Sequence, residues 1–140
     1  MVQFVVGNEG KGKTRYLLEQ ANTAIREASG NVVYLDKSSS KMYELNNRIR
    51  LIDLSKYPLR SSEEFIGFIC GIISQDHDLE KVYVDNFIRL AKITDDEGLA
   101  RTAEEIEMIS SMYQVDFTLS ISKDKEELAP ALQEKVVAAL

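Results

Sequence analysis

The residues best suited to chemistry stand in one run near the start of the chain. The pattern G-x-x-x-x-G-K-S/T is matched at every constrained position by Gly7-Asn8-Glu9-Gly10-Lys11-Gly12-Lys13-Thr14, which we call the glycine loop. Glycines let the backbone turn so that several N–H groups converge on phosphate oxygens. Lys13 would place a cation against the β- and γ-phosphates of a nucleoside triphosphate, and Thr14 would offer a hydroxyl to Mg²⁺. The pattern therefore predicts triphosphate binding.

The surroundings of the glycine loop are typical of a phosphate cradle. A short apolar segment precedes it, and the helix predicted to begin near Lys13 would direct its positive end at the ligand. We expect Glu9 to point to solvent. Lys11 is predicted to be a solvated lysine, because partitioning ATPases carry their second lysine directly after the first glycine, where this chain has Asn8. The predicted nucleotide contacts are Gly7, Asn8, Glu9, Gly10, Lys11, Gly12, Lys13, Thr14 and Arg15.

A second acidic position fits the same chemistry. Val82-Tyr83-Val84-Asp85 is predicted to be a hydrophobic strand that ends in an acid, and it resembles a Walker B motif. A carboxylate at that place would hold the Mg²⁺ from the side opposite Thr14, usually through water. We therefore predict Lys13 and Asp85 as the catalytic residues and Thr14 and Asp85 as the metal site. Asp36 and Asp53 also end apolar segments; we expect Asp36 to lie at the pocket rim or to cap the next turn.

The residue that follows this acid argues against efficient hydrolysis. Many ATPases place a catalytic Glu there to activate water, whereas this chain has Asn86. The sequence leaves other bases open, and the candidates are Glu9, Glu44 and Glu97. In the segment Phe117–Ser122, Ser120 or Ser122 could sense the γ-phosphate, although hydroxyls bonded to neighbouring backbone are the more common case.

The elements that must position these residues alternate along the chain. Apolar, β-branched runs predict strands, and spacings of three and four predict helices. The predicted strands are 2–6, 31–36, 81–85 and 116–121, with a short edge strand in 48–54. The predicted helices are 13–29, one starting after Ser61 that carries a buried Cys70, one over 98–113, and a last one over about 124–139, either continuous or in two pieces around Pro130. Gly67 and Gly71 are expected to allow close packing of the second helix on the sheet.

This alternation predicts an α/β fold with a mainly parallel sheet of about five strands flanked by helices. No linker, repeat or low-complexity tract divides the sequence, so we expect one nucleotide-binding domain over 1–140. Ligands of such sheets bind at the carboxyl ends of the strands. The glycine loop and Asp85 would both lie at that edge.

Composition excludes several function classes. A single Cys rules out an internal disulfide and a cysteine zinc site. The start of the chain is not a signal peptide, and no apolar stretch reaches the ~20 residues of a membrane span, so we expect a cytoplasmic protein without membrane contact. A net charge of −6 makes nucleic acid an unlikely constant partner. A homo-oligomer or a protein partner is left open.

Taken together, Gly7–Thr14, Val82–Asp85 and the strands 31–36 and 116–121 resemble the P-loop NTPase superfamily, and among its members a minimal RecA-like ATPase core. The resemblance implies Mg²⁺-dependent binding of ATP or another NTP, with slow hydrolysis or a nucleotide switch. Two alternatives stay open, a small nucleoside or nucleotide kinase and a non-hydrolysing, nucleotide-responsive assembly subunit. Neither a correctly spaced guanine motif nor an arginine-rich kinase lid is present.

Overall fold

One parallel sheet organises the chain. The computed structural model describes all residues, Met1–Leu140, and its sheet has six strands in the order β3-β2-β4-β5-β1-β6, with every neighbouring pair parallel. The strands are β1 (Val2–Val6), β2 (Asn31–Asp36), β3 (Arg50–Asp53), β4 (Leu79–Val84), β5 (Asp116–Ile121) and β6 (Val136–Ala139). The α/β prediction is confirmed, with one strand more than expected.

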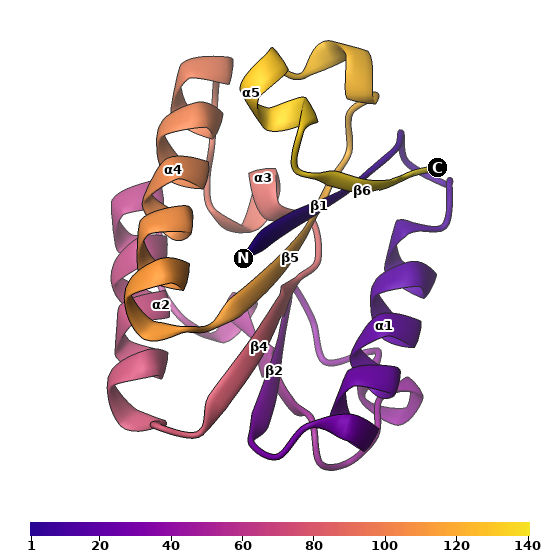
Figure 1. Cartoon of the computed structure of the whole chain (residues 1–140), viewed down its shortest axis with the longest axis vertical. Coiled ribbons are helices and arrows are strands. Elements are labelled where there is room, and N and C mark those ends of the chain that lie inside the picture. The colour runs from indigo at the N-terminus through magenta and orange to yellow at the C-terminus, as the bar shows by residue number, and fades with distance from the viewer.

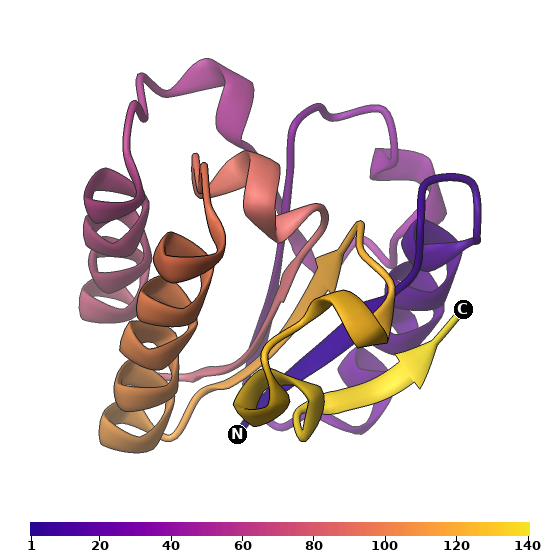
Figure 2. The same ribbon diagram turned by 90° about the horizontal axis from the view of Figure 1, so that it is seen from above.

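Helices cover both faces of this sheet. They are α1 (Lys13–Glu27), α2 (Ser62–Gln75), the one-turn α3 (Phe87–Leu90), α4 (Asp96–Tyr113) and the one-turn α5 (Pro130–Gln133); single 3₁₀ turns η1 (Met42–Glu44), η2 (Leu54–Lys56) and η3 (Lys125–Glu127) lie in the connections. Figures 1 and 2 show α1 on one face and α2 with α4 on the other. None of these helices has both the length and the apolar character needed to cross a bilayer.

The two long helices on that second face begin at capping side chains. Ser61 Oγ accepts a hydrogen bond from the N–H of Glu64 at 3.1 Å, and Asp95 Oδ1 accepts one from the N–H of Gly98 at 2.6 Å. Each bond satisfies an N–H that has no partner within the helix, and acids in the first turn add to the effect. The run Asp95–Gly98 is thus a helix cap.

The two faces carry cores of unequal size. The face under α2 and α4 holds 26 buried residues, whereas the face under α1 holds 10, among them Val5, Tyr34 and Tyr83. Alternation along the strands divides the side chains between the faces. Tyr34 and Asp36 therefore share the α1 face, and so do Tyr83 and Asp85.

The connections after β1 and β5 leave the sheet on opposite faces. β1 leads into α1, whereas the chain after β5 packs Leu128 and Leu132 into the larger core. These two strands are direct neighbours. Such a reversal opens a crevice at the carboxyl ends of the strands, which is where ligands of doubly wound sheets bind.

The predicted helix over 124–139 is wrong. The segment forms only η3 and α5, and Val136–Ala139 adds a parallel strand beside β1. Pro130 stands at the first position of α5, where its missing N–H costs nothing. The N–H of Leu140 donates to the carbonyl of Val6 at 2.9 Å. Without this strand, β1 would expose an edge of unpaired backbone groups.

The prediction of a buried Cys70 is also wrong. α2 is apolar around much of its circumference but buries only the stripe Phe65, Ile69 and Ile73, and Cys70 lies outside this stripe and is exposed. A Cβ added to Gly67 or Gly71 would meet open space, and these glycines do not pack on the sheet.

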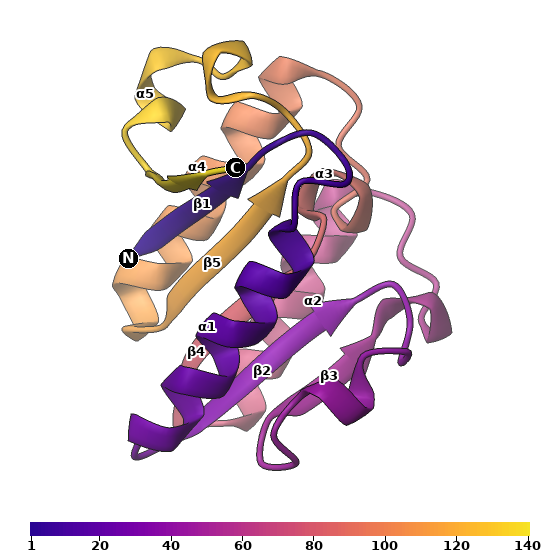
Figure 3. The same cartoon turned by 90° about the vertical axis from the view of Figure 1, so that its right-hand side faces the viewer.

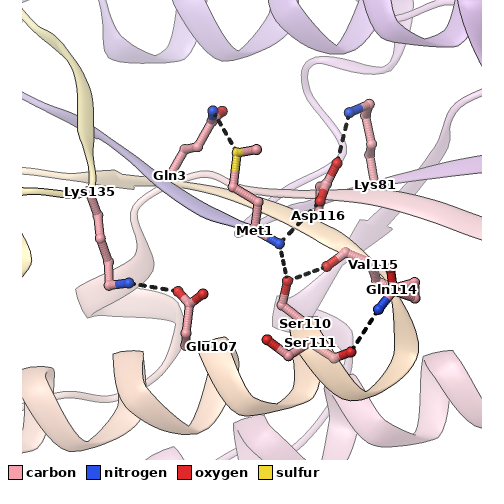
Figure 4. Close-up of polar contacts among 10 residues, drawn as sticks. All are labelled: Met1, Gln3, Lys81, Glu107, Ser110, Ser111, Gln114, Val115, Asp116 and Lys135. Atoms are coloured by element: carbon pink, nitrogen blue, oxygen red, sulfur yellow. Dashed lines mark hydrogen bonds and ion pairs between the residues drawn. The ribbon is translucent and has the colours of Figure 1, made fainter.

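Polar contacts hold the amino-terminal ends of the central strands, as Figure 4 shows. The Met1 ammonium donates to Asp116 Oδ1 at 3.2 Å and to Ser110 Oγ of α4, and Lys81 Nζ donates to Asp116 Oδ2 at 3.2 Å. One carboxylate thus connects the starts of β1, β4 and β5. This polar cluster lies at the end of the sheet away from the glycine loop.

The packing of the C-terminal segment can be tested by truncating Leu132, which is only 7% exposed. Leu132→Ala should lower the free energy of unfolding by about 2–5 kcal/mol, because it leaves a cavity in the larger core. Urea denaturation would measure this. Met112→Ala, at a side chain that is 63% exposed, is the control and should change little. Equal effects of the two substitutions would contradict the assigned packing.

Candidate functional site

The glycine loop turns directly from the end of β1 into α1, as Figure 3 shows. Gly10 and Gly12 have φ of 82° and 90°, in the left-handed region that other residues rarely adopt. Gly12 is the N-cap of α1 and provides no side-chain cap. The first N–H groups of the helix are therefore free to bind an anion.

Lys13 lies within this turn and is 8% exposed. Its Nζ donates to the carbonyl oxygen of Asn8 at 3.0 Å, so the side chain folds back over the loop. Burial lowers the pKa of Lys13, and the negative charges of Asp85 and Glu9 act in the opposite direction. A further anion in the loop would therefore stabilise the charged form of this lysine.

Asp85 accepts three hydrogen bonds from hydroxyl groups. Oδ2 accepts from Thr14 Oγ1 at 2.9 Å and from the Tyr34 hydroxyl at 3.2 Å, and Oδ1 accepts from Ser120 Oγ at 3.2 Å. The carboxylate is 8% exposed, so these donors replace the water that it loses. Thr14 and Asp85 stand 71 positions apart, and the fold brings them into direct contact.

Tyr34 was not predicted as a site residue. Burial raises the pKa of its hydroxyl well above the ordinary value, and the charge of Asp85 adds to this effect. The side chain therefore stays a neutral donor. A signal was present in the sequence: a buried tyrosine needs a partner for its hydroxyl, and Tyr34 shares a strand face with Asp36 at the same edge of the sheet.

Asn86 has a left-handed backbone, with φ 65° and ψ 66°. Its N–H donates to Ser120 Oγ at 2.6 Å, and Ser120 in turn donates to Asp85. The Ser120 hydroxyl therefore already accepts one hydrogen bond and donates another within the protein. Asparagine tolerates this backbone conformation better than most residues do, which gives a structural reason for Asn at this position.

These groups surround an open pocket of about 310 Å³. No apolar residue lines it; the lining residues are Glu9, Gly10, Gly12, Lys13, Thr14, Asp85, Asn86, Ser120 and Ser122. Five of the nine predicted nucleotide contacts are among them. The other four, Gly7, Asn8, Lys11 and Arg15, do not line this pocket. As expected, Glu9 and Lys11 are exposed.

The remaining predicted residues lie around this pocket or away from it. Arg15 is exposed on α1, where it forms an ion pair with Glu19 at 3.7 Å. Arg15 and Glu44 line an adjacent pocket of about 370 Å³ that shares Thr14 with the first. Glu97 is exposed in the first turn of α4 and lines neither pocket. Of the three candidate bases, only Glu9 reaches the pocket of Lys13.

Two further carboxylates stand beside Asp85 along the edge of the sheet. Asp36 is aligned with Asp53, and Leu35 with Val84, so that Asp36 is the cross-strand neighbour of Asp85. Burial raises the pKa of Asp36, the N–H of Lys37 opposes that shift, and Asp85 adds to it. Hydrogen bonds from Ser55 lower the pKa of Asp53, which caps η2. Asp36 Oδ1 accepts the N–H of Lys37, but Asp36 lines neither of the two pockets described above.

Comparison with known proteins found no match to any protein-family model and none to a curated protein. Any function must therefore be argued from the geometry above.

The pKa values of Asp36 and Asp53 are shifted in opposite directions. The same change, Asp to Asn, should therefore have opposite effects on the melting temperature at the two positions. The pKa of Asp36 is raised in the folded state, so folding favours the protonated carboxyl group. The contribution of Asp36 to the free energy of unfolding is therefore fully present below the ordinary pKa of 3.8 and is lost as the pH rises. Asp36→Asn should thus raise the melting temperature at pH 7, and the gain should shrink as the pH falls toward that value.

Asp53 provides the matched control. Its folded pKa is lowered, so its contribution is present above the ordinary value and is lost on acidification. Asp53→Asn should lower the melting temperature at pH 7. Thermal unfolding from pH 3.5 to 7.5 would compare the two variants, and shifts of the same sign at pH 7 would contradict the assignment.

Proposed function

We propose that this chain is a P-loop nucleotide-binding protein with a RecA-like arrangement, which binds ATP or another NTP together with Mg²⁺. The observation that carries the proposal is the 2.9 Å contact between Thr14 and Asp85. It joins the last residue of a glycine-rich loop to an acid at the end of a buried strand. Phosphate-binding folds use this pair of oxygen ligands to hold magnesium beside the nucleotide.

The strand order supports the RecA-like part of the proposal. β5 lies between β1, which leads into the glycine loop, and β4, which leads into Asp85. Many ATPases have such an inserted strand between these two positions. The glycine loop and Asp85 then both follow the carboxyl ends of buried strands. They lie at the crevice formed where the connections after β1 and β5 leave on opposite faces of the sheet.

The donor set fits magnesium that is held mainly by its nucleotide. No group of three or more His, Cys, Asp or Glu residues could enclose a metal ion. Mg²⁺ commonly takes one or two protein oxygens and completes its shell with phosphates and water. Thr14 and Asp85 would hold it here. The bound ion would neutralise charge on the phosphates.

The other residues have distinct roles in this proposal. Lys13 would bind the β- and γ-phosphates, and the free N–H groups at the start of α1 would bind phosphate oxygens. Tyr34 and Ser120 would act as positioning residues, because their hydroxyl groups fix both oxygens of the Asp85 carboxylate. Such preorganisation spares the cost of orienting the carboxylate on binding.

Asn86 favours a slow ATPase or a switch over a fast hydrolase. An amide cannot take a proton from attacking water, so this position supplies no general base. Glu9 is the one carboxylate besides Asp85 that lines the pocket, and it lies on the exposed outer arc of the loop. No observation specifically favours the kinase alternative.

Lys13→Ala should weaken MgATP binding by about tenfold to a hundredfold, because a hydrogen bond to a charged group contributes about 1.5–3 kcal/mol. Titration calorimetry would measure it. Lys11→Ala removes the same charge from the exposed part of the loop and should have a much smaller effect. Affinity that is unchanged in the Lys13 variant would overturn the assignment of the site.

Phosphate release distinguishes the activities. With ATP and with GTP, we expect turnover far below the ~10 s⁻¹ of a median enzyme. Light scattering with and without nucleotide would show whether occupancy changes the oligomeric state, as the switch idea requires. Rapid release without any change in assembly would refute the switch, and transfer of the γ-phosphate to an added nucleoside would favour a kinase.

A further inference from the structure

We propose that a second pocket, lined in part by residues of α3, binds the phosphate group of a small phosphomonoester. The pocket has a volume of about 290 Å³ and shares no residue with the pocket of the glycine loop. Three cations line it, Lys37, Arg89 and Lys92, together with Ser55, Tyr57 and three leucines. No acidic side chain is part of the lining.

The three cations come from separate parts of the fold. Lys37 follows the end of β2, Arg89 lies on α3, and Lys92 lies just after α3. Lys92 has φ of 57°, the left-handed conformation that ends α3, where the N–H of Ile93 donates to the carbonyl of Ile88 at 3.0 Å. This helix end places Lys92 beside Arg89 in the lining of the pocket.

None of the three cations is neutralised by a direct partner. The structure has six ion pairs, and Lys37, Arg89 and Lys92 take part in none of them. Among the acids nearby, Asp36 accepts the N–H of Lys37 and feels the charge of its side chain, which partly opposes the rise that burial causes in the pKa of Asp36, and Asp53 accepts two bonds from Ser55. In a chain of net charge −6, three unpaired cations around one pocket are a site for an anion.

The lining indicates which anion would fit. Arginine and lysine together suit a phosphate, to which the guanidinium can donate two parallel hydrogen bonds. Leu54 and Leu90 provide a buried apolar floor, and the ring of Tyr57, itself packed against Phe68 at 5.3 Å, is 48% exposed. The nucleoside part of a small phosphomonoester could pack on this apolar surface while its phosphate group binds the three cations.

The same features argue against a nucleic-acid polymer. Backbone binding needs a basic stripe that extends over several phosphates. Here the cations gather at one pocket, and the chain continues directly into Asp95, Asp96 and Glu97. A pocket of about 290 Å³ is just below the range of about 300–1,000 Å³ that is usual for small-molecule sites.

The test is calorimetry on the full chain at low salt with inorganic phosphate and with AMP, on the Lys13→Ala background so that the glycine loop contributes little. We expect AMP to bind more tightly than phosphate, and both to bind less tightly as NaCl is added. The double variant Lys37→Gln/Arg89→Gln should lose at least about tenfold in affinity for both. It leaves Lys92, with its unusual backbone, in place.

Lys56→Gln is the matched control, because Lys56 is exposed on η2 beside Tyr57 but does not line the pocket. It should leave both affinities unchanged, and circular dichroism should show that every variant is folded. Four outcomes would overturn the proposal: no binding at millimolar ligand, equal losses in the Lys56 control, no loss in the double variant, or tighter binding of an oligonucleotide than of AMP. These measurements use the Lys13 variant, in which the glycine loop contributes little to binding. Their result therefore tests the second pocket separately from the nucleotide site proposed at the glycine loop.

Discussion

The structure of the candidate site depends on one buried carboxylate. Asp85 is 8% exposed, and a charge removed from water in this way is costly unless hydrogen bonds replace the lost hydration. Hydroxyl groups from α1, β2 and β5 provide them. Satisfying Asp85 therefore fixes the start of α1 and the ends of three parallel strands relative to one another. The interactions that would prepare the site for a metal ion also hold together the edge of the sheet.

The direction of the connections gives this edge its shape. Because the chain leaves β1 toward one face and β5 toward the other, the space above their carboxyl ends is not crossed by a helix. The glycine loop lies there, and Gly10 and Gly12 allow its backbone to turn without steric strain. β6 allows β1 to occupy an interior position, so the strand that carries the loop is paired along both edges.

Those parts of the site that depend on local patterns could be predicted from the sequence. The glycine loop needs particular backbone angles, and Asp85 directly follows a buried strand; both leave a signal within a few residues. The contacts of Tyr34 and Ser120 depend on the register between β2, β4 and β5, which no local pattern contains. β6 was missed for a similar reason. Val136–Ala139 follows good helix formers, and only the free edge of β1 makes it a strand.

A hydrogen-bond path connects Asp85 to the start of α3. Ser120 Oγ donates to Asp85 and accepts from the N–H of Asn86, so the carboxylate and the next peptide share one hydroxyl. Asn86, in its left-handed conformation, is also the N-cap of α3, which carries Arg89 to the second pocket. A ligand that moved Asp85 would therefore act directly on the start of a single-turn helix. If both proposed ligands bind and are coupled in this way, the anion would change the affinity for nucleotide by the same factor by which nucleotide changes the affinity for the anion. Under the proposed function, Asn86 meets the backbone requirement of this connection and leaves the position without a carboxylate base.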